Sequence, residues 1–370
     1  MTSHLFSPIT MRQVTLENRI MVSPMCQYSA VNGCASDWHL MHLGQFSVSG
    51  IGLLMVEMTD VEPRGRISPY CMGLYSDENE QALNRVVQFC RRYGNTKIGI
   101  QIAHAGRKGS TLPPWQGRKP LAPARGGWQT VAPSALSTSK EAPEPKALDR
   151  GEIASLRNAF AAATRRAARI GFDVVELHAA HGYLLHQFLS PLSNLRDDEY
   201  GGSVENRMRF PLEVFTAMRA VWPANKPLGV RVSVTDWAEG GWTLEDTVLF
   251  ISELKARDCD WVDVSSGGLV KNQTIPVGPG YQVPFADRIR AETGITTVAI
   301  GMITEAQQAE EIISTGKADM VALARGMLYD PRWAWHAAAE LNGEVNYPVQ
   351  YLRCRPWVRN DIFSEREASR

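Results

Sequence analysis

Residues 172–183 read FDVVELHAAHGY, an apolar run that ends in two histidines and a tyrosine. The apolar part has the length and composition of a buried β-strand. The polar cluster at its end consists of His178, His181 and Tyr183. A strand that ends in two imidazoles and a phenol presents reactive groups at the edge of a rigid scaffold, so this segment is a candidate functional site. Histidines near strand ends are also often held by neighbouring backbone groups, and the pair alone favours neither interpretation.

Similar apolar runs recur along the chain and alternate with amphipathic helical stretches. The eight strand-length runs are 19–24, 52–58, 97–103, 172–178, 227–233, 260–265, 296–301 and 318–324. The helical stretches include Gly151 to Ile170, and Leu244 to Arg257 after the N-cap Thr243. Eight strand–helix repeats with continuously apolar strands predict an α/β fold, a closed (β/α)8 barrel of the TIM type.

A doubly wound open sheet is the competing architecture. It would place a G-x-G-x-x-G turn between a strand and a helix. Arg125-Gly126-Gly127 and Gly278-Pro279-Gly280 are glycine-rich but lack that context. The sequence therefore indicates no resident dinucleotide-binding fold.

Bulk composition narrows the class of protein. The chain has 370 residues, 44% of them hydrophobic, with 39 basic and 39 acidic side chains. This balance indicates small-molecule partners rather than nucleic acid or an anionic membrane. No apolar window is long enough to span a membrane and no leader pattern is visible, so we expect a cytoplasmic protein. The six cysteines show no C-x-x-C spacing, which argues against a zinc knuckle or an iron–sulfur cluster.

The domain organisation is predicted to be simple. A single barrel domain is expected over residues 1–357, followed by a flexible charged tail over 358–370. Residues 109–147 contain seven prolines and two tryptophans, Trp115 and Trp128. Because this stretch is too long for an ordinary connection, we expect it to cap the mouth of the barrel, with the tryptophans as buried anchors.

Active residues of such barrels stand at the carboxyl ends of the strands. The predicted strand ends carry Ser23, Met25, Cys26 and Tyr28; Gln101 and His104; His178 and His181; Arg231; Ser266 and Gly267; Gly301 and Met302; and Ala324 and Arg325. Arg231 lies in an apolar strand and requires an anionic partner, either an internal carboxylate or a cofactor that becomes anionic on reduction. Gly301 and Arg325 end the last two strands, where barrels usually hold a phosphate.

In these residues the chain resembles the Old Yellow Enzyme family, specifically its bacterial thermophilic-like, xenobiotic reductase-type branch. The matching segments are Ser23 to Cys26 with Tyr28, Gln101 to Lys108, His178 to Leu184, Phe188 to Asn194, Asp198 to Ser203, Glu205 to Arg207, Val230 to Ser233, Gly301 to Ile303 and Pro348 to Tyr351. The resemblance runs over nearly the whole chain. It implies a barrel that holds FMN noncovalently, accepts hydride from NADPH or NADH, and reduces the activated C=C bond of α,β-unsaturated carbonyl compounds by a ping-pong mechanism.

The resemblance also implies roles around the cofactor. Gln101 should hydrogen-bond the flavin pyrimidine ring, and Arg231 should offset negative charge near N1 and the C2 oxygen. Gly301, Met302 and Arg325 should hold the phosphate. The full implied cofactor set is Ser23, Pro24, Met25, Cys26, Met58, Gln101, Arg231, Ser266, Gly267, Gly301, Met302, Ala324 and Arg325. Some relatives have glycine at the position of Ala324.

For the substrate, the resemblance implies that His178 and His181 donate hydrogen bonds to the carbonyl oxygen while Tyr183 gives a proton to the α-carbon. Cys26 should tune the flavin potential and touch the substrate. Tyr28 should lie beside the substrate oxygen. Arg353 matches an arginine that reaches a neighbouring subunit's active site, which implies a homodimer or homotetramer.

Three other interpretations remain open. The first is a metal-dependent hydrolase or lyase with His178 and His181 as ligands and a third such as His104; we predict no metal. The second is a relative of the dienoyl-CoA reductases, for which the cysteine spacing and the length are lacking. The third is a flavin-binding sensor without turnover.

Overall fold

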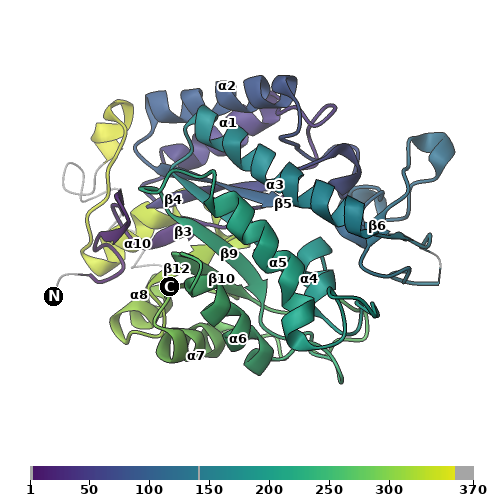
Figure 1. Ribbon diagram of the computed structural model, residues 1–370. Coiled ribbons are helices and arrows are strands. Elements are labelled where there is room, and N and C mark those ends of the chain that lie inside the picture. Colours follow the sequence, from purple (N-terminus) through teal and green to yellow (C-terminus); the bar gives the residue numbers. More distant parts are fainter. Residues whose placement is uncertain (1–2, 141, 355–370) are drawn as a thin grey trace.

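The computed structural model describes residues 3–140 and 142–354. Its centre is a closed barrel of parallel strands in the order β10-β11-β12-β3-β4-β5-β8-β9 (Figure 1). The barrel strands are β3 (Ile20–Val22), β4 (Leu53–Asp60), β5 (Lys97–Ala103), β8 (Val174–Ala179), β9 (Leu228–Ser233), β10 (Trp261–Ser265), β11 (Thr296–Ala299) and β12 (Met320–Leu323). Each overlaps one of the eight predicted runs, with β4 extending two residues and β8 one residue beyond its run, so the (β/α)8 prediction is confirmed.

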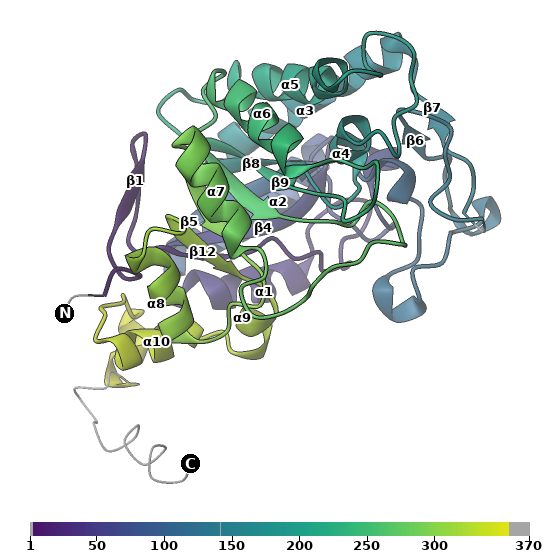
Figure 2. The same cartoon turned by 90° about the horizontal axis from the view of Figure 1, so that it is seen from below.

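Helices form the outer layer around the barrel (Figure 2). They are α1 (Asp37–Ser47), α2 (Asp77–Tyr93), α3 (Arg150–Ile170), α4 (Leu184–Leu189), α5 (Val204–Arg219), α6 (Leu244–Lys255), α7 (Val283–Thr293), α8 (Ala306–Ser314), α9 (Arg325–Tyr329) and α10 (Trp333–Leu341). Helix α6 begins after Thr243, whose side chain accepts a hydrogen bond from the Asp246 N–H, as predicted. It ends two residues before the predicted Arg257, and α3 ends at Gly171, which has a φ of 95°.

The barrel interior is apolar at the amino-terminal end of the strands. Leu53, Met55, Val174 and Trp261 fill it and are fully buried or nearly so. An antiparallel hairpin of β1 (Ile9–Met11) and β2 (Val14–Leu16) packs its buried side chains into the same cluster. The amino-terminal end is therefore plugged, and the polar residues gather at the opposite end.

The segment 109–147 contains short elements only. They are the 3₁₀ turns η3 (Pro114–Gln116) and η4 (Pro123–Arg125) and the strands β6 (Val131–Ala132) and β7 (Lys146–Ala147); three more 3₁₀ turns are η1 (Pro63–Gly65), η2 (Gly106–Lys108) and η5 (Val349–Cys354). Trp115 is 67% exposed, so it is not the buried anchor we expected. It still meets the edge of Tyr28 at 5.7 Å between ring centroids, because the segment folds back toward the barrel mouth there. The capping role stays a prediction.

Two further predictions concern the ends of the chain and its location. The last part of the predicted barrel domain, 355–357, and the tail 358–370 lie outside the described residues. Among the described helices none has the length and apolar character needed to cross a membrane.

Candidate active site

Neighbouring strands bring five polar side chains to one region of the barrel. Gln101 on β5 is in register with Glu176 on β8. His178 on β8 is in register with Arg231 on β9, and Arg231 with Asp263 on β10. All five are buried. Because parallel strands end at the same edge, residues far apart in the sequence meet at the barrel mouth.

The two histidines at the end of β8 face one another. His178 Nδ1 accepts a hydrogen bond from the Ala180 N–H at 3.2 Å, which leaves Nε2 of His178 as the protonated nitrogen. That Nε2 lies 3.4 Å from His181 Nδ1. His181 Nε2 is 2.7 Å from Ser265 Oγ, so a hydroxyl proton donated to Nε2 leaves the proton of His181 on Nδ1. In this tautomer both imidazole N–H groups are available to a ligand oxygen, whereas in the other tautomer of His181 the His178 Nε2–H donates to His181 Nδ1.

Both imidazoles are held in the neutral form. The pKa of His178 and that of His181 are lowered well below the ordinary value, first by burial and then by the positive charge of Arg231. A neutral ring has one N–H donor and one acceptor nitrogen. The pair can therefore donate two hydrogen bonds without being charged.

Tyr183 lies beside this pair and belongs to an apolar cluster at the barrel mouth. Its ring meets His178 edge-on, with 5.0 Å between centroids. The cluster also contains Met58, Cys26 and Tyr28, so residues from the ends of β3, β4 and β8 come together as the sequence predicted. The hydroxyl of Tyr183 makes no hydrogen bond with the described part of the chain and is free to bind a ligand.

The acidic groups of this cluster stay protonated at neutral pH. Burial raises the pKa of Tyr183 well above its ordinary value, and nearby Cys26 and Tyr28 raise it further. Burial likewise raises the pKa of the Cys26 thiol, followed by the charges of Glu57 and Asp60. Tyr183 thus carries a proton to give, whereas Cys26 is a thiol rather than a reactive thiolate.

Lys108 is a site residue to which the sequence analysis assigned no role. Its Nζ donates to the carbonyl oxygens of His181 at 2.7 Å and Gly268 at 2.9 Å, and lies 5.0 Å from the centre of the Tyr183 ring. Burial lowers the pKa of Lys108 to about 8, with Arg118 and Arg107 adding to the effect. Lys108 therefore joins the loops after β5, β8 and β10. The sequence signal for Lys108 was its position in the segment Gln101 to Lys108, which matches the family.

Gly182 allows the loop after β8 to approach the loop after β10 closely. Gly182 has a φ of 69°, and a Cβ there would lie 2.5 Å from the Gly268 carbonyl oxygen. A side chain would collide with backbone, so the turn between His181 and Tyr183 requires glycine.

Arg231 has an internal anionic partner. Its Nε lies 3.3 Å from Asp263 Oδ2. On the same layer, Gln101 Nε2 donates to Glu176 Oε1 at 2.6 Å. Of the two partners considered for Arg231, the internal carboxylate is present, so its burial alone does not require an anionic cofactor. The sequence analysis missed both carboxylates because each lies inside an apolar strand.

A cavity of about 870 Å³ opens beside this cluster at the ends of β3, β10, β11 and β12. Its lining includes the predicted residues Ser23, Arg231, Gly301, Met302, Ala324 and Arg325. Gly301 has a φ of 109°, and Arg325 forms no ion pair within the described residues. This volume is typical of small-molecule sites. An unpaired arginine beside a glycine-lined wall suits a phosphate.

Several lining residues were not predicted. Tyr281 and Gln282 line the cavity beside Gly301, and Gln282 Oε1 accepts a hydrogen bond from Ser266 Oγ at 2.6 Å. They follow the Gly278-Pro279-Gly280 turn, whose Gly280 N–H donates to the Gly301 carbonyl at 2.8 Å. That turn was examined only as a dinucleotide-binding motif, which it is not.

The remaining predicted cofactor residues lie near this cavity or the apolar cluster. Pro24 and Met25 are partly buried after β3, and Gly267 has a φ of 68° after β10. Arg353 is exposed on η5 and is not among the cavity-lining residues. Its predicted role in a neighbouring subunit stays a prediction.

The cavity and the polar cluster fit FMN. Ser265 lines the cavity and also contacts His181, so the cavity lies next to the histidine pair. Arg325 can hold the phosphate at one end, while Gln101 and Arg231 offer an amide and a guanidinium to the pyrimidine edge at the other. The donor set suits a flavin nucleotide with its ring toward the histidines.

The metal interpretation finds little support in the geometry. His104 Nε2 lies 3.0 Å from Glu62 Oε1, and its Nδ1 accepts from the Gly106 N–H at 2.9 Å. Both ring nitrogens of His104 therefore contact groups other than His178 and His181. Within residues 3–140 and 142–354, no group of three or more His, Cys, Asp or Glu side chains is arranged to hold a metal ion.

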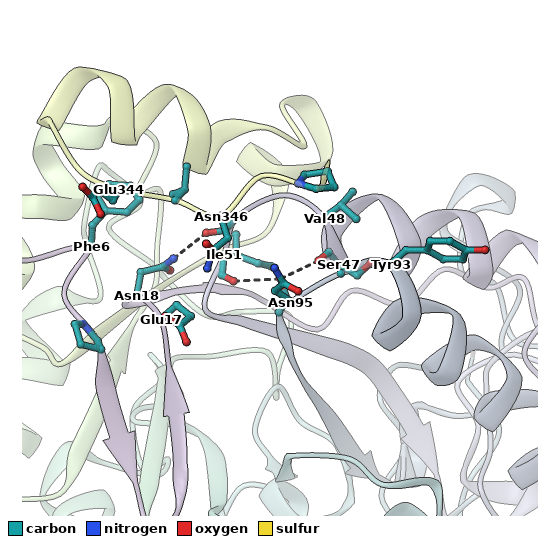
Figure 3. Close-up of a pocket in the computed structure, with 16 residues that line it drawn as sticks. Phe6, Glu17, Asn18, Ser47, Val48, Ile51, Tyr93, Asn95, Glu344 and Asn346 are labelled. Atoms are coloured by element: carbon teal, nitrogen blue, oxygen red, sulfur yellow. Dashed lines mark hydrogen bonds between the residues drawn. The ribbon is translucent and has the colours of Figure 1, made fainter. Parts of the chain in front are cut away.

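A second cavity, of about 500 Å³, lies at the opposite end of the barrel (Figure 3). Some of its polar side chains have protein partners. Asn18 Nδ2 donates to the Gly50 carbonyl at 2.8 Å, Ser47 Oγ to a carbonyl of its own helix at 2.8 Å, and Thr96 Oγ1 to the Ser47 carbonyl at 3.1 Å. The side chains of Glu17, Asn95, Glu344 and Asn346, which also line the cavity, form no hydrogen bond or ion pair with the described residues. We assign no function to this cavity.

Fold and site together are those of a flavin-dependent barrel oxidoreductase. A family model described as the NADH:flavin oxidoreductase / NADH oxidase family matches residues 4–344. The chain belongs to this family, which includes the Old Yellow Enzymes, and FMN is its cofactor.

Individual relatives agree with this assignment. An NADPH dehydrogenase of Geobacillus thermodenitrificans (strain NG80-2) is 45% identical over 355 residues, which cover 95% of this chain and 99% of the relative. Morphinone reductase in complex with tetrahydroNAD is 26% identical, with a TM-score of 0.75 and coverage of 93% of this chain and 92% of that one. A 2-naphthoyl-CoA reductase structure shares the fold with a TM-score of 0.83 at 23% identity. This chain spans about half its length, 52%, while 91% of this chain is covered.

Proposed function

We propose that this enzyme is an NADPH dehydrogenase that reduces the activated C=C bond of α,β-unsaturated carbonyl compounds. The observation that carries the proposal is the pair of neutral imidazoles, in which His178 Nε2 and His181 Nδ1 lie 3.4 Å apart. When Ser265 gives its proton to His181 Nε2, both nitrogens can donate to one carbonyl oxygen that gains negative charge during reaction. NADPH as the donor follows the name of the 45% identical relative.

FMN, held by Gln101, Arg231 and Arg325, would supply hydride transfer from NADPH to the β-carbon of the alkene in two separate half-reactions. His178 and His181 bind the carbonyl oxygen and withdraw electron density from the β-carbon. Ser265 orients His181 through its 2.7 Å hydrogen bond. Tyr183 holds the proton that is transferred to the α-carbon, because its raised pKa keeps it protonated at neutral pH.

The apolar cluster around Tyr183 supports the choice of substrate. Met58, Cys26 and Tyr28 offer an uncharged surface to the carbon skeleton of an enone. The C=C bond of such a molecule can then lie between the proton donor and the cofactor. Which alkenes the enzyme accepts depends on the shape of this apolar cluster and of the segment 109–147.

The experiment is a visible spectrum of the purified protein, taken anaerobically before and after NADPH and then after 2-cyclohexenone. We expect flavin absorbance that bleaches with NADPH and returns with the enone. Absorbance that bleaches but never returns with any activated alkene would contradict the proposed substrate class. It would instead favour a flavin-binding sensor, the alternative without turnover.

A further inference from the structure

The polar cluster in the barrel contains more negative than positive groups. Glu176 on β8 and Asp263 on β10 are completely buried, and Arg231 on β9 is the guanidinium between them. Asp263 forms an ion pair with Arg231, although its oxygens make no hydrogen bond with the described residues and burial raises its pKa too, whereas Glu176 Oε1 accepts only the amide proton of Gln101. Oε2 of Glu176 has no hydrogen-bond partner in the described part of the chain. If both carboxyls were ionised, the cluster would carry one uncompensated buried charge, which is costly.

The surroundings of Glu176 favour its neutral form. Burial raises the pKa of Glu176 to about 8 and the charge of Asp263 raises it too, while Arg231 and the hydrogen bond from Gln101 act in the opposite direction. The other ionisable group on this face of β8 is His178, which is neutral for the reasons given above. Glu176 therefore changes charge in a pH range where proteins are easily studied.

The position of Glu176 links it to the cofactor. Its carboxyl fixes the amide of Gln101, since Nε2 of Gln101 is used in the 2.6 Å hydrogen bond. Oε1 of Gln101 is then left to accept from the ring N–H of the flavin. The pyrimidine edge also carries two electronegative carbonyl oxygens, which an ionised carboxyl beside Gln101 would repel.

We propose that Glu176 is a positioning residue that takes up a proton when FMN binds, so that the Arg231–Asp263–Glu176 cluster is neutral beneath the flavin ring. The inference rests on FMN as the cofactor and not on the identity of the alkene. Failure of the enone test would leave it standing.

The test is the affinity of the cofactor-free full chain for FMN between pH 7.5 and 9.5, followed by flavin fluorescence. We expect the wild-type Kd to rise above the pKa of Glu176, approaching about tenfold per pH unit, which is the limit for one linked proton. Glu176→Gln keeps the acceptor for Gln101 but cannot ionise, so its Kd should change by less than about threefold over the same range, well below that linkage limit. Glu253→Gln, on the surface of α6, is the matched control and should behave as wild type.

A second readout needs no variant. Calorimetric titrations of wild type at pH 9 in two buffers of different ionisation enthalpy count the protons taken up with FMN, and we expect a value approaching one. A count near zero would overturn the proposal, as would an equal pH dependence of affinity in wild type and Glu176→Gln. If Glu176→Gln fails to fold, Glu176→Asp retains an ionisable group and should retain the proton uptake; its loss would count equally against the proposal.

Discussion

At the scale of the residue, Tyr183, the proposed proton donor, lies beside the histidine pair and has no hydrogen-bond partner among the described residues. Replacing Tyr183 by Phe should lower the rate of enone reduction by about 100-fold or more, as expected for loss of a general acid. Reduction of the flavin by NADPH should change little, because that step needs no such proton. Rapid-mixing absorbance measures the two half-reactions separately. Equal slowing of both would rule out the assigned role.

Ser265 provides a sharper test of the oxygen site, because it acts on His181 rather than on the ligand. In Ser265→Ala the proton of His181 is no longer directed to Nδ1. A phenolate ligand, which mimics the carbonyl oxygen, should bind about three- to tenfold more weakly, the equivalent of one hydrogen bond. Spectral titration with the phenol measures this. Ser252→Ala, on the exposed face of α6, is the control, and an unchanged affinity in Ser265→Ala would refute the proposed tautomer.

At the scale of the element, α4 is held in place by one buried carboxylate. Asp236, in the loop after β9, accepts hydrogen bonds from Ser190 Oγ at 2.6 Å and the Trp242 N–H at 2.8 Å, and lies 2.9 Å from His186 Nε2. His186 in turn accepts from the Gly182 N–H at 2.9 Å, so this chain of contacts reaches the turn that carries Tyr183.

This carboxylate gives a pH-dependent contribution to stability. Burial alone would raise the pKa of Asp236, but His186 and the hydrogen bonds outweigh burial and the pKa is lowered below 3.8. A lowered pKa means that the contribution is complete above about 3.8 and is lost as the pH falls through the lower folded value.

Replacing Asp236 by Asn should therefore lower the free energy of unfolding by about 3 kcal/mol at pH 7, because a buried partner of His186 is lost. The difference from wild type should shrink as the pH falls from about 3.8 toward the lower folded pKa, because the unfolded wild-type chain takes up the proton first. Urea unfolding at pH 7 and at a series of pH values below 3.8 measures this change. A difference that does not depend on pH would contradict the charged role of Asp236.

At the scale of the whole molecule, the barrel should unfold as one unit that FMN stabilises. Free FMN at about 100 times its Kd should add about 2.7 kcal/mol to the free energy of unfolding, since only the folded barrel binds it. Calorimetry with and without FMN should show one transition that moves to higher temperature. Two separate transitions would contradict the single-domain prediction, and an unmoved transition would contradict the proposed cofactor site.

The sequence predicted the barrel because each strand is continuously apolar and the helices between them are amphipathic. It also singled out His178, His181 and Tyr183, since these residues lie at or just after the end of a strand. It did not identify Glu176, Asp263 or Lys108 as part of the site. The carboxylates lie within apolar strands, and only the register between strands shows that they meet Gln101 and Arg231.

The hairpin β1–β2, which plugs the amino-terminal end of the barrel, determines how ligands enter and leave. Because the barrel is closed at this end, a ligand that enters at the mouth must also leave through the mouth. Under the proposed function, oxidised nicotinamide must leave before an enone can bind. An excess of NADPH or of the enone should therefore inhibit the reaction with the other compound.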